Sequence, residues 1–141
     1  MTETVAEVTL DHRARGLLEQ PVVAHLATLN KSGSPRVEPV WFVLEGDRVV
    51  ITTDYKTVKA ANIRRDPRVG LSAISPKYPL DHVAMRGRVV ETREDDDLIF
   101  LDALSHRYTG APYPRRRWSR RQVYVIELDW IRVSIAHDHD A

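Results

Sequence analysis

The residues best suited to chemistry lie in the stretch 51–69, where hydroxyl, ammonium and amide side chains gather. Its pattern predicts a strand, a polar loop and a short helix. Free backbone N–H groups and the dipole at a helix N-terminus favour a bound anion. Thr53 and Thr57 can add hydroxyl donors, and Lys56 and Lys59 supply positive charges suited to a phosphate. The stretch therefore predicts a phosphate-type anion site.

Lys59 and Asn62 are three residues apart, so they share one face of the predicted helix. The same residues also fit a second interpretation, a capped surface helix whose lysines are solvated. Local spacing is compatible with both.

Three helices and six strands are expected around this stretch. Prolines end the first two helices, and an acidic run at residues 94–97 suits the positive end of the third. The strands alternate with tight polar turns, as in a β-meander. The helices are predicted at 9–19, 57–66 and 94–108, and the strands at 22–30, 35–44, 48–53, 68–75, 81–93 and 122–135.

The predicted strand at 35–44 is apolar on both faces. Successive side chains of a strand point to opposite sides, and here each side carries three large apolar residues. The helices are too few to cover both faces, whereas closure into a barrel and burial against a second subunit would do so. The sequence therefore predicts a mainly β fold, a barrel of six or seven strands with two or three short helices, that forms a homodimer. One face carries Val37, Trp41 and Val43, and the other carries Val40, Phe42 and Leu44.

Composition limits the alternatives. The 141 residues fit one domain, 1–141, with flexible tails expected at 1–8 and 137–141. The net charge of +1 provides no global field for nucleic acid or an anionic membrane. There is no cysteine, so disulfides and thiolate chemistry are excluded. The N-terminus lacks the pattern of a signal peptide and the apolar runs are short, so we expect a cytoplasmic protein.

Two further clusters are less informative. Five arginines surround Trp118 within residues 115–121, but the acidic run at 94–97 balances them and no nucleic-acid-binding fold is evident. A solvated loop that borders a ligand is the preferred interpretation. The tract from His137 to Asp140 resembles a metal-binding sequence, yet ligands on a flexible chain end form weak sites, so no metal is expected. Trp41 and Trp130 are assigned to packing.

Several segments together resemble a known family. They are His25–Leu29, Gly33–Val37 with Val40–Phe42, Thr52 and Thr53 followed by Lys59–Val69, and Val83–Val89. This combination resembles the split-barrel superfamily of pyridoxamine-phosphate-oxidase-like, flavin-binding proteins. Residues 115–125 and the closing strands are similar to its actinobacterial branch, which uses the deazaflavin coenzyme F420.

The resemblance implies a cofactor that lies across a dimer interface, with its phosphate held after the third strand. Lys59 matches the phosphate-binding lysine. Thr52 and Thr53 match strand residues that line the cofactor, and Asn62 is a neighbour. The helix start with Lys56 and Thr57 belongs to the same expected site.

The resemblance also implies roles for two other strands. Arg36, Val37 and Pro39 match the second strand, which tends to run past the isoalloxazine-like ring. His82 falls on a strand that can approach the ring or the substrate, which makes it a candidate proton donor. An isolated strand histidine is more often structural, so both roles are kept for it.

Departures from the family pattern bear on the cofactor. Val58 stands where pyridoxamine-phosphate oxidases usually have arginine beside the lysine, and their C-terminal Arg-Leu-His type motif has no counterpart. The expected activity is therefore that of an F420H2-dependent reductase acting on a small unsaturated or cyclic molecule. Lys56, Arg36 or residues 115–121 would meet the carboxylates of the F420 tail. The alternatives are an FMN-dependent oxidoreductase of the same fold and a non-catalytic carrier of deazaflavin, flavin or haem.

Overall fold

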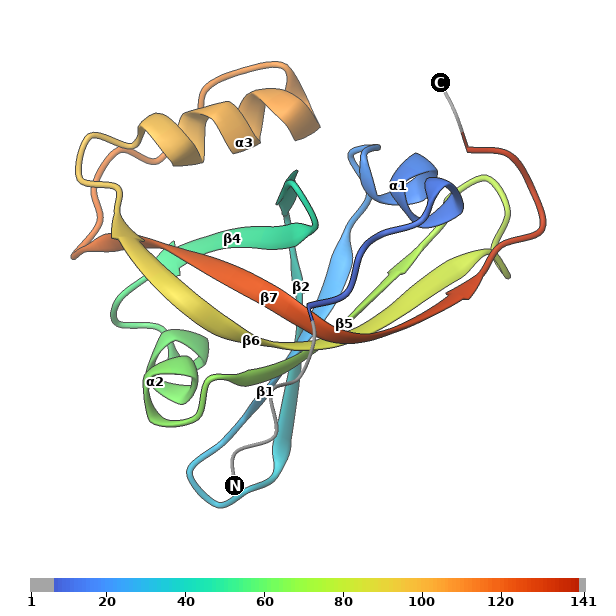
Figure 1. Cartoon of the computed structure of the whole chain (residues 1–141). Helices are drawn as coiled ribbons and strands as arrows, with labels where there is room; N and C mark the ends of the chain where they lie inside the picture. Colours follow the sequence, from blue (N-terminus) through green and yellow to red (C-terminus); the bar gives the residue numbers. More distant parts are fainter. Residues whose placement is uncertain (1–6, 140–141) are drawn as a thin grey trace.

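The computed structural model describes residues 7–139, which form one seven-stranded antiparallel sheet with three helices (Figure 1). The strand order is β2-β1-β5-β6-β7-β4-β3. The mainly β fold expected from the sequence is confirmed. The helices are α1 (His12–Leu18), α2 (Val58–Arg65) and α3 (Ile99–Thr109); the strands are β1 (Ala24–Leu29), β2 (Pro35–Val40), β3 (Val43–Glu45), β4 (Arg48–Asp54), β5 (Arg68–Ile74), β6 (His82–Glu94) and β7 (Arg121–Ser134).

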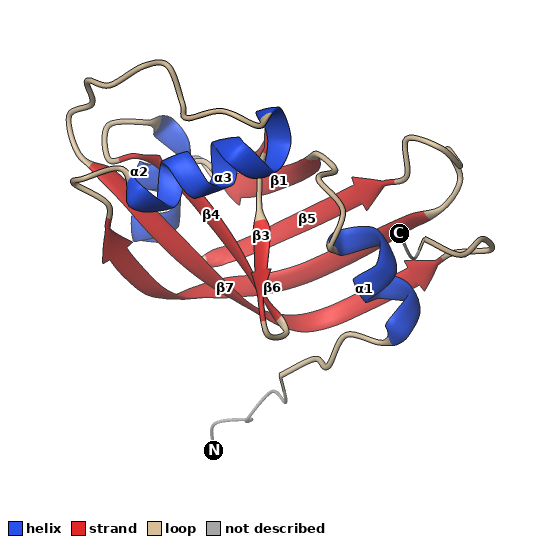
Figure 2. Cartoon of the chain, turned by 90° about the horizontal axis from the view of Figure 1, so that it is seen from above, coloured by secondary structure: helices blue, strands red, loops and turns tan. Residues whose placement is uncertain are grey.

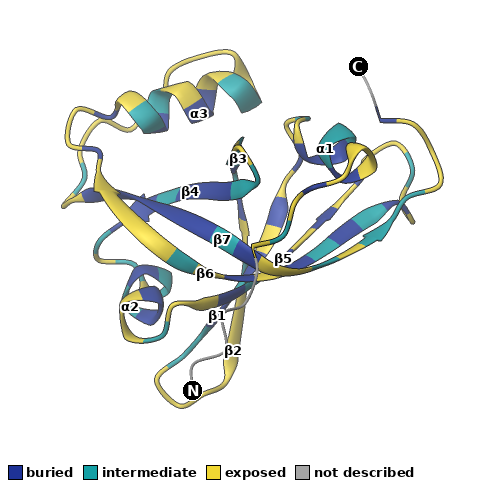
Figure 3. Cartoon of the chain, in the orientation of Figure 1, coloured by how far each residue is buried: buried dark blue, intermediate teal, exposed yellow. Residues whose placement is uncertain are grey.

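One apolar cluster joins α1 and α2 to β1, β2, β4, β5, β6 and β7. Leu17 and Leu18 of α1 are fully buried in it, as are Ile51 of β4 and Ile126 of β7. β4 and the first half of β7 are buried almost throughout, whereas β2 and the end of β6 are mostly exposed (Figure 3). Within residues 7–139 no helix has the length and apolar character needed to cross a bilayer.

The strand predicted at 35–44 is two strands, which is the main correction to the expected fold. β2 pairs with β1, whereas β3 pairs with β4 at the other edge of the sheet. Consecutive strands thus form the two edges, and residues 41 and 42 connect them. The break occurs because Phe42 enters the core, where its side chain is fully buried. This short connection brings the two sheet edges together, as a split barrel requires.

The third helix begins later than predicted. Glu94 is the last residue of β6, and Leu98 adopts a left-handed conformation with φ 63° before α3 starts at Ile99. The acidic run still binds the N-terminus of the helix, although its residues precede the helix. The two carboxylate oxygens of Asp95 accept the N–H groups of Phe100 and Leu101, each at 2.9 Å. α3 then lies across β3 and β4, where Phe100 packs near Val43 and Val50 (Figure 2).

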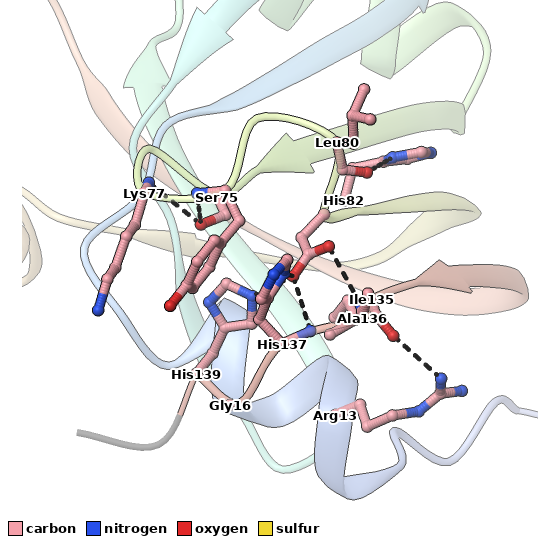
Figure 4. Close-up of polar contacts among 12 residues, drawn as sticks. Arg13, Gly16, Ser75, Lys77, Leu80, His82, Ile135, Ala136, His137 and His139 are labelled. Carbon is pink, nitrogen blue, oxygen red and sulfur yellow. Dashed lines mark hydrogen bonds and ion pairs between the residues drawn. The ribbon is translucent and has the colours of Figure 1, made fainter.

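A flexible tail was expected at 137–141, but the chain is packed as far as residue 139. Residues 140–141, like residues 1–6, lie outside the described residues. Asp81, the residue before β6, forms hydrogen bonds with this segment. Ala136, His137 and His139 are labelled in Figure 4. Its carboxylate accepts the backbone N–H groups of Ala136 and His137 at 3.1 Å. The rings of His137 and His139 place one nitrogen each at 3.0 Å from its Oδ2. Tyr78 stacks on His137 with ring centroids 3.7 Å apart.

We predict that Asp95→Ala destabilises the protein by about 1–2 kcal/mol, because two N–H groups at the start of α3 lose their acceptor. Urea unfolding measures the change in the free energy of unfolding. Asp97→Ala is the matched control, since Asp97 is an exposed member of the same run. Equal effects of both substitutions would show that Asp95 is not the cap.

Asp81 makes stability depend on pH. Burial disfavours its charged form, but the N–H of Ala136 and the rings of His139 and His137 outweigh this and hold the pKa of Asp81 far below its ordinary 3.8. A depressed pKa stabilises the fold above the unfolded-state value and loses that contribution as pH falls below it. We therefore predict that the stability advantage of the wild type over Asp81→Asn shrinks between about pH 5 and about pH 3. Urea unfolding across this range checks it; a constant difference would contradict the assignment.

Candidate functional site

A cavity of about 320 Å³ lies where the β2–β3 crossover, β4, α2, α3 and the start of β7 meet. Its apolar lining comes from strands, α3 and connecting segments, and its polar lining, among the described residues, includes two cations but no carboxylate. Such a combination suits a ligand with a flat apolar part and an anionic part. The lining residues are Val23, Pro39, Val40, Trp41, Thr52, Lys59, Leu101, Leu104, Tyr113 and Arg121.

One wall of the cavity is aromatic. The ring of Trp41 stacks on Tyr108 of α3, with centroids 4.9 Å apart and an interplanar angle of 7°. Tyr113 meets Trp41 edge-on at 6.1 Å. Trp41 was assigned to packing from the sequence. In the structure Trp41 packs against Tyr108 and also lines the cavity. A ring fixed in this way offers a rigid flat surface to a planar ligand.

α3 is tied to the sheet beside this wall. The Tyr108 hydroxyl donates to Val22 O at 2.6 Å and accepts the N–H of Phe42 at 3.1 Å. Burial raises the pKa of Tyr108, so the phenol keeps its proton at neutral pH. Arg107 donates to Phe42 O and to three carbonyls at the end of α1, those of Leu18, Glu19 and Gln20. These bonds position α3 over the crossover.

Lys59 lines the cavity from α2, as the anion-site prediction requires. Its side chain is 17% exposed, and its Nζ lies 3.3 Å from Oε2 of Glu38 on β2. Glu38 is also bound by Arg36, and this hydrogen bond, followed by the charge of Lys59, lowers the pKa of Glu38. The ammonium therefore shares its charge with a carboxylate of the same chain.

Arg121 is the second cation and was not singled out from the sequence beyond its place in the 115–121 run. It is 7% exposed, and its Nη2 donates to Oγ1 of Thr52 at 3.1 Å. Burial lowers the pKa of Arg121. No carboxylate among residues 7–139 forms an ion pair with it. A sequence signal exists in hindsight, because Arg121 opens a strand whose other residues are mostly apolar.

Other predicted residues at the start of α2 build the helix rather than the cavity. Thr57 is the N-cap, and its hydroxyl accepts the N–H of Ala60 at 3.2 Å. Thr53 is buried, and its hydroxyl lies 3.1 Å from that of Thr57. Lys56 is exposed on the loop before the helix. The capped-helix interpretation therefore describes this helix start, while Lys59, in the first turn of the same helix, lines the cavity.

Asn62 is 2% exposed and connects α2 to β1. Its amide donates to Oγ1 of Thr28 and to Oδ1 of Asn30, both at 3.0 Å. It accepts from Nη2 of Arg65 at 2.9 Å. The structure thus places Asn62 in the framework that orients α2 and not in the cavity lining.

The three site residues predicted on β2 differ in their position relative to the cavity. Pro39 lines the cavity, whereas Arg36 and Val37 are exposed, Val37 at 62%. β2 is an edge strand of the sheet, so its outward residues are uncovered within one chain.

His82, the candidate proton donor, lies at the opposite end of the sheet. It pairs with Ser134, the last residue of β7, whereas Arg121 is the first. Thirteen residues at roughly 3.3 Å each put about 40 Å of strand between them. Its ring Nδ1 lies 2.9 Å from Leu80 O (Figure 4). The structure therefore does not bring His82 to the cavity of its own chain.

Comparison with known proteins fits this geometry. The family model described as pyridoxamine 5'-phosphate oxidase matches residues 10–134. The chain belongs to this family. No curated protein matches it. An F420 reductase of known structure aligns with a TM-score of 0.81 and 29% identity, covering 87% of this chain and 98% of that one.

Two further solved structures are similar in fold. The conserved hypothetical protein Rv2991 from Mycobacterium tuberculosis aligns with a TM-score of 0.71 and 23% identity, covering 98% of this chain and 91% of that one. A putative pyridoxamine 5'-phosphate oxidase from Listeria innocua aligns with a TM-score of 0.64 and 18% identity, over 83% and 91% of the two chains. The likeness places this family member among flavin-type oxidoreductase folds, with a relation to the F420 branch.

Proposed function

We propose that this pyridoxamine 5'-phosphate oxidase family member is an F420H2-dependent reductase that transfers a hydride to a small unsaturated or cyclic substrate. The observation that carries the proposal is the composition of the cavity, whose apolar and aromatic walls accompany Lys59 and Arg121 without any lining carboxylate. The similarity to an F420 reductase favours F420 over FMN.

The lining fits the parts of such a cofactor. Trp41 and Tyr113 offer flat surfaces for a planar ring, and Leu101 and Leu104 of α3 shield that side from water. When bound, the deazaflavin supplies the hydride chemistry, and the protein binds, orients and excludes water. Lys59 is the proposed contact for the phosphate.

The cavity of one chain is small for a complete cofactor. At about 320 Å³ it lies at the lower end of the roughly 300–1,000 Å³ typical of ligand pockets. Exposed valines adjoin it: Val23 lines it at 41% exposure, and Val37 and Val58 neighbour lining residues on β2 and α2. A second copy of the chain would bury these side chains and complete the site, so we propose a homodimer with the cofactor at its interface.

The homodimer predicts a light-scattering mass twice that of one chain at micromolar concentration. Val37→Asp places a charge on the proposed interface and should shift the protein toward the monomer. Leu80→Asp is the matched control, because Leu80 is 86% exposed in the β5–β6 loop far from the cavity. A wild-type monomer, or equal behaviour of both variants, would contradict the interface.

Titration of the purified protein with F420 and with FMN, followed by fluorescence, tests the cofactor. Tight binding of FMN alone would favour an FMN-dependent oxidoreductase of the same fold. Binding of F420 without oxidation of F420H2 by a panel of unsaturated substrates would favour a carrier.

Lys59→Ala should weaken cofactor binding about ten- to a hundredfold, equivalent to about 1.5–3 kcal/mol, because a charge-assisted contact to the phosphate is lost. Glu38→Gln removes the carboxylate that competes for Lys59 and should bind at least as tightly as the wild type. Lys31→Ala, in the exposed β1–β2 turn, is the charge-matched control. Unchanged affinity in Lys59→Ala would remove this lysine from the site.

A further inference from the structure

A buried guanidinium that forms no ion pair with any residue among 7–139, that of Arg121, lines the cavity. An arginine has five N–H donors, and burial is costly unless they are paired. Among residues 7–139, the side chain of Arg121 donates to a single acceptor, Oγ1 of Thr52. Its Nε is buried and has no partner there. The chain therefore folds with an unused cationic donor set at the cavity.

The nearest acidic groups are engaged elsewhere. Asp54 accepts from the hydroxyl and N–H of Ser119 and from the N–H of Arg120. Asp95 caps α3. Both carboxylates favour the charged form of Arg121 through space, but neither forms an ion pair with it. Asp54 and Asp95 thus favour the protonated guanidinium of Arg121 without accepting hydrogen bonds from it.

Trp118 supplies a second unused donor next to the first. Its ring lies 4.3 Å from the guanidinium carbon of Arg121, and the guanidinium of Arg115 lies 3.9 Å from the same ring. The indole Nε1 is buried without an acceptor among the described residues. Trp118 also lines a neighbouring cavity of about 390 Å³ that shares Arg121 with the first. Two different side chains therefore present unmatched N–H groups at one place.

We propose that Arg121 and Trp118 form a binding subsite for an oxyanion group, a carboxylate or a phosphate, of a ligand held in the cavity. A planar guanidinium fork matches two oxygens of such a group, and the indole N–H adds a third donor. The inference rests on the proposed function in that Arg121 lines the same cavity, while Trp118 reaches it from the neighbouring one. Nε of Arg121 and Nε1 of Trp118 are shielded from water, so binding requires a small displacement of the irregular segment 111–120, as loops commonly allow.

Titration with inorganic phosphate tests the subsite directly. The chain has three tryptophans, so ¹⁵N-labelled protein shows three indole N–H signals, and Trp118→Phe assigns that of Trp118. We expect phosphate to shift the Trp118 signal saturably and to leave those of Trp41 and Trp130 nearly unchanged. A Trp118 signal that does not move would overturn the proposal.

Variants separate a specific site from general attraction to the arginine-rich loop. Arg121→Gln should weaken phosphate binding about tenfold or more, whereas Arg117→Gln, an exposed arginine of the same loop, should not. If Arg121→Gln does not fold, Trp118→Phe keeps an aromatic ring but loses the N–H donor, and calorimetry should then show weaker phosphate binding. Equal affinity of Trp118→Phe and wild type, or equal loss in Arg117→Gln and Arg121→Gln, would contradict the subsite.

The source of the oxyanion is decided by repeating the titration on cofactor-loaded protein. If the group belongs to the cofactor, loading abolishes the phosphate-induced shift and Arg121→Gln weakens cofactor binding. If it belongs to the substrate, the shift persists and cofactor affinity is unchanged. A phosphate shift without binding of F420 or FMN would overturn the proposed function alone, whereas cofactor binding without any response of Trp118 would overturn the subsite alone.

Discussion

The cavity depends on how α3 is fastened to the crossover between the two sheet edges. Phe42 enters the core, and its backbone N–H and carbonyl are both held by α3, through Tyr108 and Arg107. The same two side chains bind carbonyls before β1, at residues 18–20 and 22. One helix thus locks the two edges of the split barrel and the end of α1 together. Trp41, next to Phe42, stacks on Tyr108 and becomes a wall of the site as a consequence.

Charge at this site is distributed unequally. Lys59, the proposed phosphate contact, is paired with Glu38, whereas Arg121 is more deeply buried and forms no ion pair among the described residues. A cation already neutralised gains less from a bound anion, because the anion must compete with the existing carboxylate. An unpaired buried cation gains more, since the ligand supplies the missing counter-charge. The site therefore has two cationic positions of different strength.

Much of the fold followed from local pattern, because alternation and turn residues locate strands without knowledge of their partners. The errors occurred where the pairing of strands far apart in the sequence decides the structure. Nothing near Trp41 reveals that β2 and β3 form opposite edges of the sheet, so one strand was predicted for two. At the site, Lys59 and Pro39 were found from the sequence, but Arg121 was not, because its lack of a counter-charge depends on residues 54 and 95 being engaged elsewhere. His82 lies at the other end of the sheet from this cavity, because the pairing of β6 with β7, which local pattern does not reveal, sets its place.

The lining also limits what the protein itself can contribute to a reaction. Among the residues that the structure describes, it holds no histidine and no carboxylate, and its one phenol, Tyr113, belongs to the aromatic wall. His137 and His139 belong to the chain end, and they bind Asp81 at the far end of the sheet. A site without its own acid–base pair is suited to chemistry that a bound redox cofactor carries, because the protein then needs only to orient the ring and hold its charged groups.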